Sequence, residues 1–463
     1  MSKSRTETDS FGAIEVPAQA LWGAQTARSL HFFAIGSQRM PLDLIHALAW
    51  VKWAAARVNA NLQLLDTAKA LAIADAAQRV ASGEFDAEFP LSVWQTGSGT
   101  QSNMNVNEVV ASLASLSLGG GLGADLCVHP NDDVNLGQSS NDVFPTAMHM
   151  AAGLHTQQSL LPALRSLKDA LSAKAAEFTE VVKIGRTHWQ DATPITLGQE
   201  FGGYAAQLTL CEHSIQQALE AVHALAIGGT AVGTGLNTHP EFGRRVAGQL
   251  AEKLGVPWTQ AHNLFAAMAG HEALVALHGG FKMLAIALTK IANDLRLMGS
   301  GPRAGLGELV LPQNEPGSSI MPGKVNPTQV EALTMVCAQV MGHDAAIGFA
   351  ASQGQFELNV YKPLIALNVQ DSIHLLADAM RSFTTHCVAG IGINAERMET
   401  YVQTSLMLVT ALSPHIGYDQ AARIAKHAHA HGSTLREAAL ELGLVSAEQF
   451  DAWVNPRNML GNG

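Results

Sequence analysis

The chain has 463 residues, of which 47% are apolar and only 14% are charged, against about 25% charged residues in ordinary soluble domains. So few charges cannot cover an isolated particle of this size, which leaves a membrane protein or an oligomer whose subunits cover much of each other's surface. The net charge of −11 argues against a protein that binds nucleic acid.

The sequence favours the oligomer over the membrane protein. A membrane-spanning helix needs about 18 or more consecutive apolar residues, and the charge-free stretch at 221–240 is interrupted by His223, Gly228, Gly229, Asn237 and Pro240. Residues 1–10 mix both charge signs and lack the apolar segment of a secretory signal. We therefore expect a cytoplasmic protein that does not bind a membrane.

The cysteines are too far apart for a metal or disulfide framework. They form no CxxC pair and lie at Cys127, Cys211, Cys337 and Cys387. Zinc ribbons and iron–sulfur clusters need cysteines close together in the sequence. We expect buried, reduced thiols.

Helical patterns dominate the chain. Residues 1–137 contain short patterns rich in turns, whereas long proline-free stretches follow at 195–239, 259–301, 328–362 and 364–413. The stretch at 195–239 is helical as far as Gly228. In the stretch at 259–301, apolar residues recur at helical spacing from Leu274 to Ile291, so one helix there could exceed about 50 Å. It should end at residues 299–302, Gly-Ser-Gly-Pro.

These patterns predict a mainly α fold with three domains. Long, mostly apolar helices can cover their surfaces only by packing against each other. We expect a mixed, mostly helical domain at 1–137, a long-helix bundle at 138–393 and a small helical domain at 394–463. In the last domain, capped helices should begin near Ser433-Thr434 and Ser446.

Polar, glycine-punctuated segments stand out against the apolar background. They lie at residues 96–103, 138–142, 185–191 and 315–327, and each precedes or interrupts a helical pattern. A single such segment is explained equally well by helix capping. Capping needs one polar residue, however, and these segments supply several. Small polar side chains at helix N-termini favour an anion site, with Lys324 as its natural positive charge.

The segment at 315–327 has the composition of a mobile lid. Gly317 and Gly323 bracket Ser318-Ser319-Ile320-Met321-Pro322, so the backbone can turn at both ends. The alternative is an ordinary surface loop, in which an exposed Ile320-Met321 pair would be unusual.

These segments resemble the fumarase/aspartase superfamily. Residues 317–327, Gly-Ser-Ser-Ile-Met-Pro-Gly-Lys-Val-Asn-Pro, match its signature, and Gly323 followed by Thr328-Gln329 is similar to the class II fumarase version. Aspartate ammonia-lyases more often have alanine at the position of Gly323. Other motifs fit in order at residues 21–26, 97–100, 129–132, 139–142, 185–188 and 228–235.

The resemblance implies a fold, an assembly and a reaction. The fold is the three-domain superfamily fold, assembled into a homotetramer with a twenty-helix core in which each active site draws on three subunits. The reaction is the reversible hydration of fumarate to (S)-malate through an aci-carboxylate intermediate, with no cofactor and no metal. The alternatives are an aspartate ammonia-lyase and a non-catalytic structural protein, since lens crystallins were recruited from this superfamily.

The resemblance also assigns roles to residues. Ser318 matches the base, which needs backbone donors or Lys324 to stabilise its alkoxide, and His188 matches the residue that handles the water. Glu331 matches an acid that orients the histidine, although a first-turn acid favoured by the helix dipole is an alternative. The implied catalytic set is Ser318, His188, Lys324, Asn326 and Glu331. The implied substrate-binding set is Ser98, Gly99, Thr100, Ser139, Ser140, Asn141, Thr187, Ser319, Lys324, Val325 and Asn326.

A secondary anion site is implied at His129, Pro130, Asn131 and Asp132. A helix that simply begins at Pro130, with Asp132 in its first turn, is the alternative. Family members often carry basic residues just before this histidine, whereas this chain has Asp-Leu-Cys-Val at 125–128. We therefore expect weaker anion binding here than in typical relatives.

Two further patterns are given ordinary explanations. Residues 119–124 fit a loose GxGxxA dinucleotide pattern but lack a βαβ context, so we expect a loop. His427, His429 and His431 have metal-like spacing, but no carboxylate or cysteine nearby in the sequence completes a site. We expect a solvated helix face there.

Overall fold

The computed structural model describes residues 4–461 and is mainly α, as predicted. The chain divides into two compact units. The first comprises Met1–Pro162, His213–Ala285 and Ala338–Ala377, and the second comprises Ala163–Glu212, Ile286–Cys337 and Asp378–Gly463. The three predicted domains stay a prediction.

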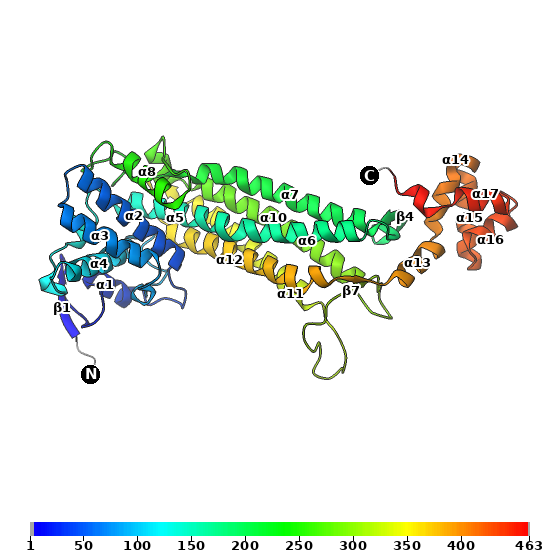
Figure 1. Ribbon diagram of the computed structural model, residues 1–463, viewed down its shortest axis with the longest axis horizontal. Coiled ribbons are helices and arrows are strands. Elements are labelled where there is room, and N and C mark those ends of the chain that lie inside the picture. Colours follow the sequence, from blue (N-terminus) through cyan, green and yellow to red (C-terminus); the bar gives the residue numbers. More distant parts are fainter. Residues whose placement is uncertain (1–3, 462–463) are drawn as a thin grey trace. The chain divides into compact units, whose positions relative to one another are not determined.

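Short and medium helices form most of the first unit. They are α1 (Ala24–Phe32), α2 (Leu42–Asn61), α3 (Thr67–Ala81), α4 (Thr100–Ser117), α5 (Ser140–His155), α8 (Phe242–Leu254) and α9 (Leu264–Ala269). The first unit also contains three two-stranded sheets among its described residues: β1 (Ser4–Asp9) with β2 (Gly12–Pro17), β5 (Ala224–Leu225) with β6 (Thr259–Gln260), and β8 (Gly354–Gln355) with β9 (Leu358–Asn359). Helices α2, α3 and α4 pack together at its N-terminal end (Figure 1).

Long helices contribute residues to both units. They are α6 (Leu161–Glu177), α7 (Leu197–Val222), α10 (Glu272–Met298), α11 (Thr328–Ala351) and α12 (Lys362–His386). Within each unit, the segments of these helices run alongside one another (Figure 1). The apolar spacing predicted for α10 is confirmed, because its stripe is fully buried at Leu274, Leu277, Phe281, Leu284, Leu288 and Ile291.

The second unit adds two small sheets and the C-terminal helices. The sheets are β3 (Val182–Thr187) with β4 (Gln190–Thr196), and β7 (Leu309–Val310) with β10 (Gly392–Ile393). The helices are α13 (Ala395–Thr404), α14 (Ser413–Ile416), α15 (Tyr418–His431), α16 (Leu435–Glu441) and α17 (Ala447–Trp453). Thr434 and Ser446 form capping boxes at α16 and α17, which confirms the predicted helix starts.

Several predicted helices are too long. The expected helix at 259–301 is two helices, because Gly270 adopts an extended conformation after α9 and α10 begins only at Glu272. With 27 residues, α10 is about 40 Å long. Helix α7 ends at Val222 rather than near Gly228, and α11 ends at Ala351 before the β8–β9 hairpin.

The expectations for the cysteines and for the histidines of α15 also need correction. Cys127 is exposed, whereas the other three cysteines are buried and free. A carboxylate does lie beside the histidines of α15, because Glu441 Oε2 is 2.9 Å from His427 Nε2.

By length and composition, α10 could cross a membrane. Half of its most apolar window is buried inside the protein, however, as in the core helix of a soluble protein.

Candidate active site

The segment at 96–103 makes a tightly packed entrance to α4. Gly99 is the N-cap residue with φ +78°, and a Cβ there would lie 2.2 Å from the ring of Phe144. A Cβ on Gly97 would lie 1.4 Å from the carbonyl oxygen of Val360. Both positions therefore require glycine. The hydroxyls of Ser98 and Thr100, on either side of Gly99 in the sequence, are 2.9 Å apart.

The segment at 138–142 begins α5 with a capping box. Ser139 Oγ accepts from Asn141 N at 3.2 Å, and Asp142 Oδ1 accepts from Ser139 N at 2.9 Å. Asn103 Nδ2 donates to Ser140 Oγ at 2.9 Å, so two of the four predicted polar segments meet in the first unit. Two helix N-termini thereby present small polar side chains together, an arrangement that suits an anion.

Two buried lysines lie in the same unit, and the sequence analysis missed both. Lys52 is fully buried and donates to Asn135 Oδ1 and Gln138 Oε1, each at 2.9 Å. The Nζ of buried Lys362 has no hydrogen-bond partner among residues 4–461. Burial lowers the pKa of each lysine to about 7, although Asp142 opposes the shift. Lys52 lies within an apolar helical pattern and Lys362 precedes a proline, so neither carried a local signal.

Asp142 is the buried carboxylate that faces these lysines. Besides Ser139 N, it accepts from Gly228 N at 3.0 Å and from Thr230 N at 2.9 Å. Burial raises the pKa of Asp142 to about 6, against the opposing effect of these backbone donors. The carboxylate thus ties the start of α5 to the turn at 228–230.

His188 lies at the tip of the β3–β4 hairpin in the second unit. His188 and Trp189 have φ of +54° and +63°, and Thr187 pairs with Gln190 across the turn. Two consecutive left-handed residues are typical of a type I′ turn, which normally contains Asn-Gly. Larger side chains in this conformation store backbone strain, a feature common at functional sites.

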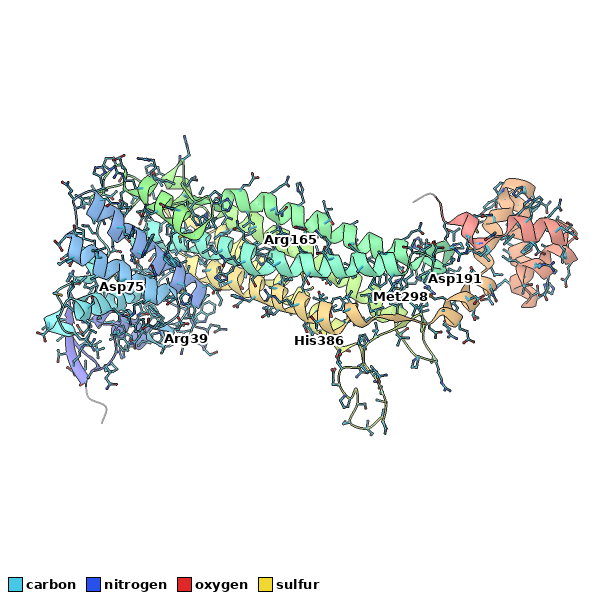
Figure 2. The ribbon with its side chains drawn as sticks, in the orientation of Figure 1. Arg39, Asp75, Arg165, Asp191, Met298 and His386 are labelled. Carbon is cyan, nitrogen blue, oxygen red and sulfur yellow. The ribbon has the colours of Figure 1, made fainter. Side chains whose placement is uncertain are left out.

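Buried ion pairs anchor this hairpin. Arg186 donates to both oxygens of fully buried Glu308 at 2.9 and 2.8 Å, and Lys183 donates to Glu200 at 2.9 Å. His188 lines a cavity of about 800 Å³, together with Met298 of α10. Figure 2 labels Met298 and Asp191, the residue that pairs with Arg186 across the hairpin.

The loop at 313–327 holds most of the predicted catalytic residues. Gly317 N donates to Lys324 O at 2.9 Å, and Asn326 Nδ2 donates to Gly317 O, so the loop closes on itself. Asn314 Nδ2 fixes its base by donating at 3.0 Å to the carbonyl of His386, labelled in Figure 2. The loop encloses a cavity of about 390 Å³ lined by residues that include Ser318, Lys324 and Val325.

Ser318 has the backbone donors that a basic hydroxyl needs. Its Oγ accepts from Ile320 N at 3.2 Å and from Met321 N at 2.9 Å. Two such donors favour a developing alkoxide. Ile320 and Met321 are 82% and 49% exposed, an unusual position for apolar side chains in an ordinary surface loop.

Asn141, Ser319 and Glu331 are the predicted residues that remain to be placed. Asn141 Nδ2 donates to Ala231 O at 2.9 Å in the first unit. In the second unit, Ser319 is exposed on the loop, and Glu331 lies in the first turn of α11 with its N–H bonded to Pro327 O. The segments at 185–191 and 315–327 both belong to the second unit.

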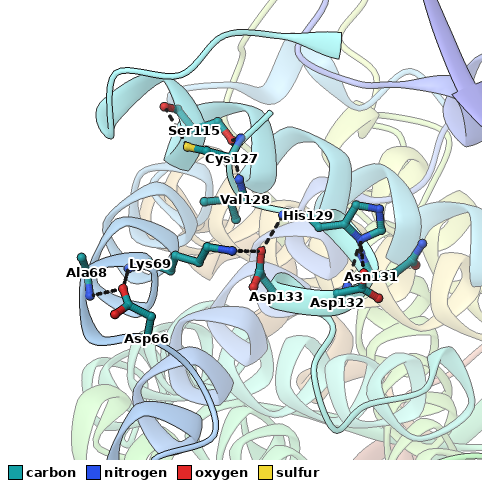
Figure 3. Close-up of polar contacts among 10 residues, drawn as sticks. All are labelled: Asp66, Ala68, Lys69, Ser115, Cys127, Val128, His129, Asn131, Asp132 and Asp133. Carbon is teal, nitrogen blue, oxygen red and sulfur yellow. Dashed lines mark hydrogen bonds and ion pairs between the residues drawn. The ribbon is translucent and has the colours of Figure 1, made fainter. Parts of the chain in front are cut away.

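The predicted secondary anion site is largely occupied by its own side chains. His129 Nδ1 accepts from Asn131 N at 3.3 Å and from Asp132 N at 3.1 Å, so it caps the short helical turn Pro130–Val134 (Figure 3). Asp133 Oδ2 accepts from His129 N at 2.7 Å and from Lys69 Nζ at 2.8 Å (Figure 3). The N–H groups of Asn131 and Asp132 and the ammonium of Lys69 are therefore paired with protein groups, and the secondary anion site stays a prediction.

Comparisons with known proteins decide the family. Residues 12–342 match the family described as Lyase, and residues 408–461 match the family described as Fumarase C C-terminus. A fumarate hydratase class II from Chromobacterium violaceum is 64% identical over 98% of this chain and 99% of the relative. This chain belongs to the class II fumarate hydratase family.

Other members agree in sequence and in structure. The class II fumarate hydratase from Thermosynechococcus vestitus is 61% identical, with 99% of this chain and 98% of that protein covered. The class II fumarase structure from Schistosoma mansoni is 48% identical, covers 99% of both chains and has a TM-score of 0.97. The structure titled fumarate lyase:delta crystallin from Brucella melitensis, bound to cobalt, is 42% identical, covers 99% of both chains and has a TM-score of 0.95. The resemblance and the mainly α superfamily fold are confirmed.

Proposed function

We propose that this chain is a fumarate hydratase that interconverts fumarate and (S)-malate. The observation that carries the proposal is the geometry of Ser318, whose hydroxyl accepts two backbone N–H bonds inside the glycine-bounded loop. The high identity to relatives named fumarate hydratase class II supports the same activity. The substrate is a small dicarboxylate, and the reaction uses neither a cofactor nor a metal.

Ser318 is the proposed base. In the dehydration direction it removes the carbon-bound proton next to a carboxylate, and the bond electrons move onto that carboxylate to give an aci-carboxylate dianion. Lys324 supplies the positive charge for this dianion and Asn326 supplies an amide donor. Binding a dianion to a chain of net charge −11 needs such local donors.

The N-termini of α4 and α5 are the proposed binding sites for the substrate carboxylates. Ser98, Thr100, Ser140 and Asn141 offer side-chain donors, and the N-termini add favourable backbone dipoles. Buried Lys52 and Lys362 lie in the same unit and raise its local positive potential. Gly99, Ser139, Thr187, Ser319 and Val325 complete the proposed binding set.

His188 is the proposed partner of the added or departing water. An imidazole can both accept and donate a proton near neutral pH, which a reversible hydration requires. His188 lies at the tip of the β3–β4 hairpin with φ +54°, and its side chain is exposed there. Glu331 would orient this histidine, and the first-turn position of Glu331 in α11 equally suits the helix dipole.

The proposed assembly is a cytoplasmic homotetramer with active sites shared by three subunits. Helix α11 is apolar on nearly all sides, yet Met335 and Phe349 are 68% and 65% exposed in the single chain. A helix that is apolar all round is normally buried. Packing α11 against other subunits buries these side chains and accounts for the low charge content.

An aspartate ammonia-lyase is the second candidate. Gly323 has φ +79°, and no atom lies within 4 Å of a Cβ built there. Alanine at this position would fit the space but strain the backbone, so this loop conformation favours the glycine typical of fumarases. A non-catalytic structural protein would have no use for the donors around Ser318.

A substrate comparison tests the proposed function. The purified protein, without added metal, is incubated separately with fumarate, (S)-malate and aspartate. We expect fumarate to lose the absorbance of its conjugated double bond and malate to gain it, with little ammonia released from aspartate. Ammonia release at comparable efficiency would support the lyase, and inactivity on all three compounds would support the structural protein.

A further inference from the structure

Three helices of the first unit bring together a carboxylate and two imidazoles, none of which is among the predicted catalytic residues. Asp43 lies in the first turn of α2, His155 ends α5, and His374 lies on α12. His155 Nε2 is 3.2 Å from Asp43 Oδ1, and His374 Nε2 is 2.5 Å from Asp43 Oδ2. The two imidazole rings are 5.6 Å apart, centre to centre.

The spacing of these atoms suits a small divalent ion. All three potential ligand atoms lie within 4.8 Å of one another. Zinc binds imidazole nitrogen and carboxylate oxygen at about 2.0–2.2 Å, so ligand atoms of a tetrahedral site are about 3.3 Å apart. His155 Nε2 lies 3.2 Å from Asp43 Oδ1, close to this value, whereas His374 Nε2 lies 2.5 Å from the other carboxylate oxygen, Oδ2, so an ion between them requires the His374 side chain to move away from Oδ2.

The partly exposed side chains of the cluster make it accessible to a metal ion from solvent. The side chains of Asp43, His155 and His374 are 18%, 28% and 47% exposed. The carboxylate is thus largely sheltered, while His374 faces solvent. A metal ion can reach a carboxylate that is open to solvent on one side. The partial burial of the carboxylate leaves fewer water molecules to compete with the ion.

Neighbouring groups hold the carboxylate and its partners in place. The amide nitrogen of Gln370, one turn before His374, donates to Asp43 Oδ2 at 3.3 Å, and its oxygen accepts from Ala152 N at 3.1 Å. His155 is followed directly by a π-helical turn, Thr156–Leu160, a feature frequent at functional sites. Such supporting contacts orient ligands in metal centres.

Hydrogen bonds from neutral imidazoles account for the contacts of the cluster without a metal, because each carboxylate oxygen of Asp43 faces a different ring. Protonating both rings would place two like charges 5.6 Å apart, centre to centre. A divalent ion instead binds both rings in their neutral form and neutralises the carboxylate. No sequence motif indicates this site, because its members are separated by more than 100 residues.

We propose that Asp43, His155 and His374 form a binding site for a divalent transition metal, with Zn²⁺ the best match and water as the fourth ligand. Two imidazoles and one carboxylate suit zinc, whereas Mg²⁺ and Ca²⁺ prefer oxygen ligands. The bound ion cross-links α2, α5 and α12. It stabilises the fold and takes no part in the chemistry proposed for Ser318 and His188.

Equilibrium dialysis of the full-length, chelator-stripped protein against Zn²⁺ tests the site. We expect wild type to bind one tightly held Zn²⁺ per chain and to gain thermal stability on binding. His374→Gln should bind at least tenfold more weakly, because a three-residue site loses one ligand. His374→Cys should restore binding, since a thiolate is also a zinc ligand.

A matched variant separates this site from other surface histidines. His427→Gln disrupts the histidine row of α15, where Glu441 also lies, and it should bind Zn²⁺ as wild type does. Co²⁺ provides a second readout, because four-coordinate Co²⁺ absorbs visible light strongly and His374→Gln should lose this absorption. The proposal is overturned if His374→Gln and wild type bind Zn²⁺ equally, or if His427→Gln abolishes the tight binding.

Discussion

The reactivity proposed for Ser318 depends on the backbone around it. The N–H groups of Ile320 and Met321 both point at its Oγ, so the turn favours the charged form of a group that is otherwise a weak base. Gly317 makes this turn possible, because a Cβ there would lie 2.3 Å from Lys324 O. A local arrangement of a few residues therefore supports the chemical step proposed for Ser318.

Replacing Ser318 by alanine should remove the base without unfolding the loop. We expect kcat for fumarate to fall about 10²- to 10⁴-fold, as for the loss of a positioned acid–base group, with the mass of the assembly unchanged in size-exclusion chromatography. Ser352→Ala is the control, because Ser352 Oγ donates to the Phe349 carbonyl and accepts from the neighbouring Gln353 side chain, and neither residue belongs to the proposed site. If Ser318→Ala keeps half of wild-type kcat, the hydroxyl is not the base.

His129 should matter much less than His188. His129 already caps the turn at Pro130–Val134 through its Nδ1, and asparagine is also a favourable N-cap residue. We expect His129→Asn to change kcat by less than about twofold, whereas His188→Asn should lower it by about 10²-fold or more. Steady-state assays of both variants check this difference. Equal losses would show that the secondary anion site takes part in turnover.

Buried Lys52 should leave a signature in the pH dependence of stability. Burial lowers its pKa from 10.5 to about 7, so between these values the unfolded chain binds more protons than the folded one. The free energy of unfolding should therefore rise as pH increases from 7 towards 10, by up to about 1.4 kcal/mol per pH unit. Urea unfolding of wild type and Lys52→Met across this range measures it. A slope that Lys52→Met leaves unchanged would contradict this origin.

At the scale of helices, local signals predicted several starts and also the end of α10, which stops at Met298 just before the Gly-Ser-Gly-Pro sequence at 299–302. Pro327 before α11 and the capping residues Thr434 and Ser446 act within a few residues, so the sequence alone located those starts. The break between α9 and α10 falls at Gly270, where a Cβ would lie 2.3 Å from Glu272 Oε2, and a single glycine in a long apolar stretch does not by itself predict a break.

In the candidate site, too, local sequence signals were predictable and contacts between distant residues were not. The polar segments were predictable because several small polar residues cluster in the sequence. Their pairing through Asn103 and Ser140, and the burial of Lys52 and Lys362, depend on contacts across tens to hundreds of residues. The His188–Trp189 turn was also unpredictable, since neither residue is typical of left-handed backbone.

Asp142 is the strongest test of how the start of α5 is held. Alanine in its place removes the acceptor for Ser139 N, Gly228 N and Thr230 N, two of which belong to another segment. Buried donors without partners cost about 1–3 kcal/mol each, so we expect Asp142→Ala to lower the free energy of unfolding by about 3 kcal/mol or more. Chemical denaturation measures this loss.

A capping variant elsewhere provides the comparison for Asp142. Thr434→Ala removes the cap of α16, which holds only its own helix start, and should cost about 1 kcal/mol. If Asp142→Ala costs no more than Thr434→Ala, then Asp142 is an ordinary helix cap and does not join separate segments.

For the whole molecule, the low charge content and the surface of α11 have one explanation. A chain with 14% charged residues leaves apolar side chains exposed along its long helices, including Leu210 of α7, Ile286 of α10 and Met335 of α11. If these helices form the shared core of a tetramer, the exposed side chains are interface residues and not solvent-facing ones.

A lysine in place of Met335 should therefore break the assembly and not the fold. Burying an unpaired charge at an interface costs several kcal/mol, enough to weaken association about a thousandfold. We expect Met335→Lys to give a smaller particle by light scattering, with helical circular dichroism retained and fumarate turnover lost, because each proposed active site needs three subunits. Leu71→Lys on α3, where Leu71 is 61% exposed, should keep both the tetramer and the activity. A Met335→Lys particle with the mass of wild type would place α11 outside the interface.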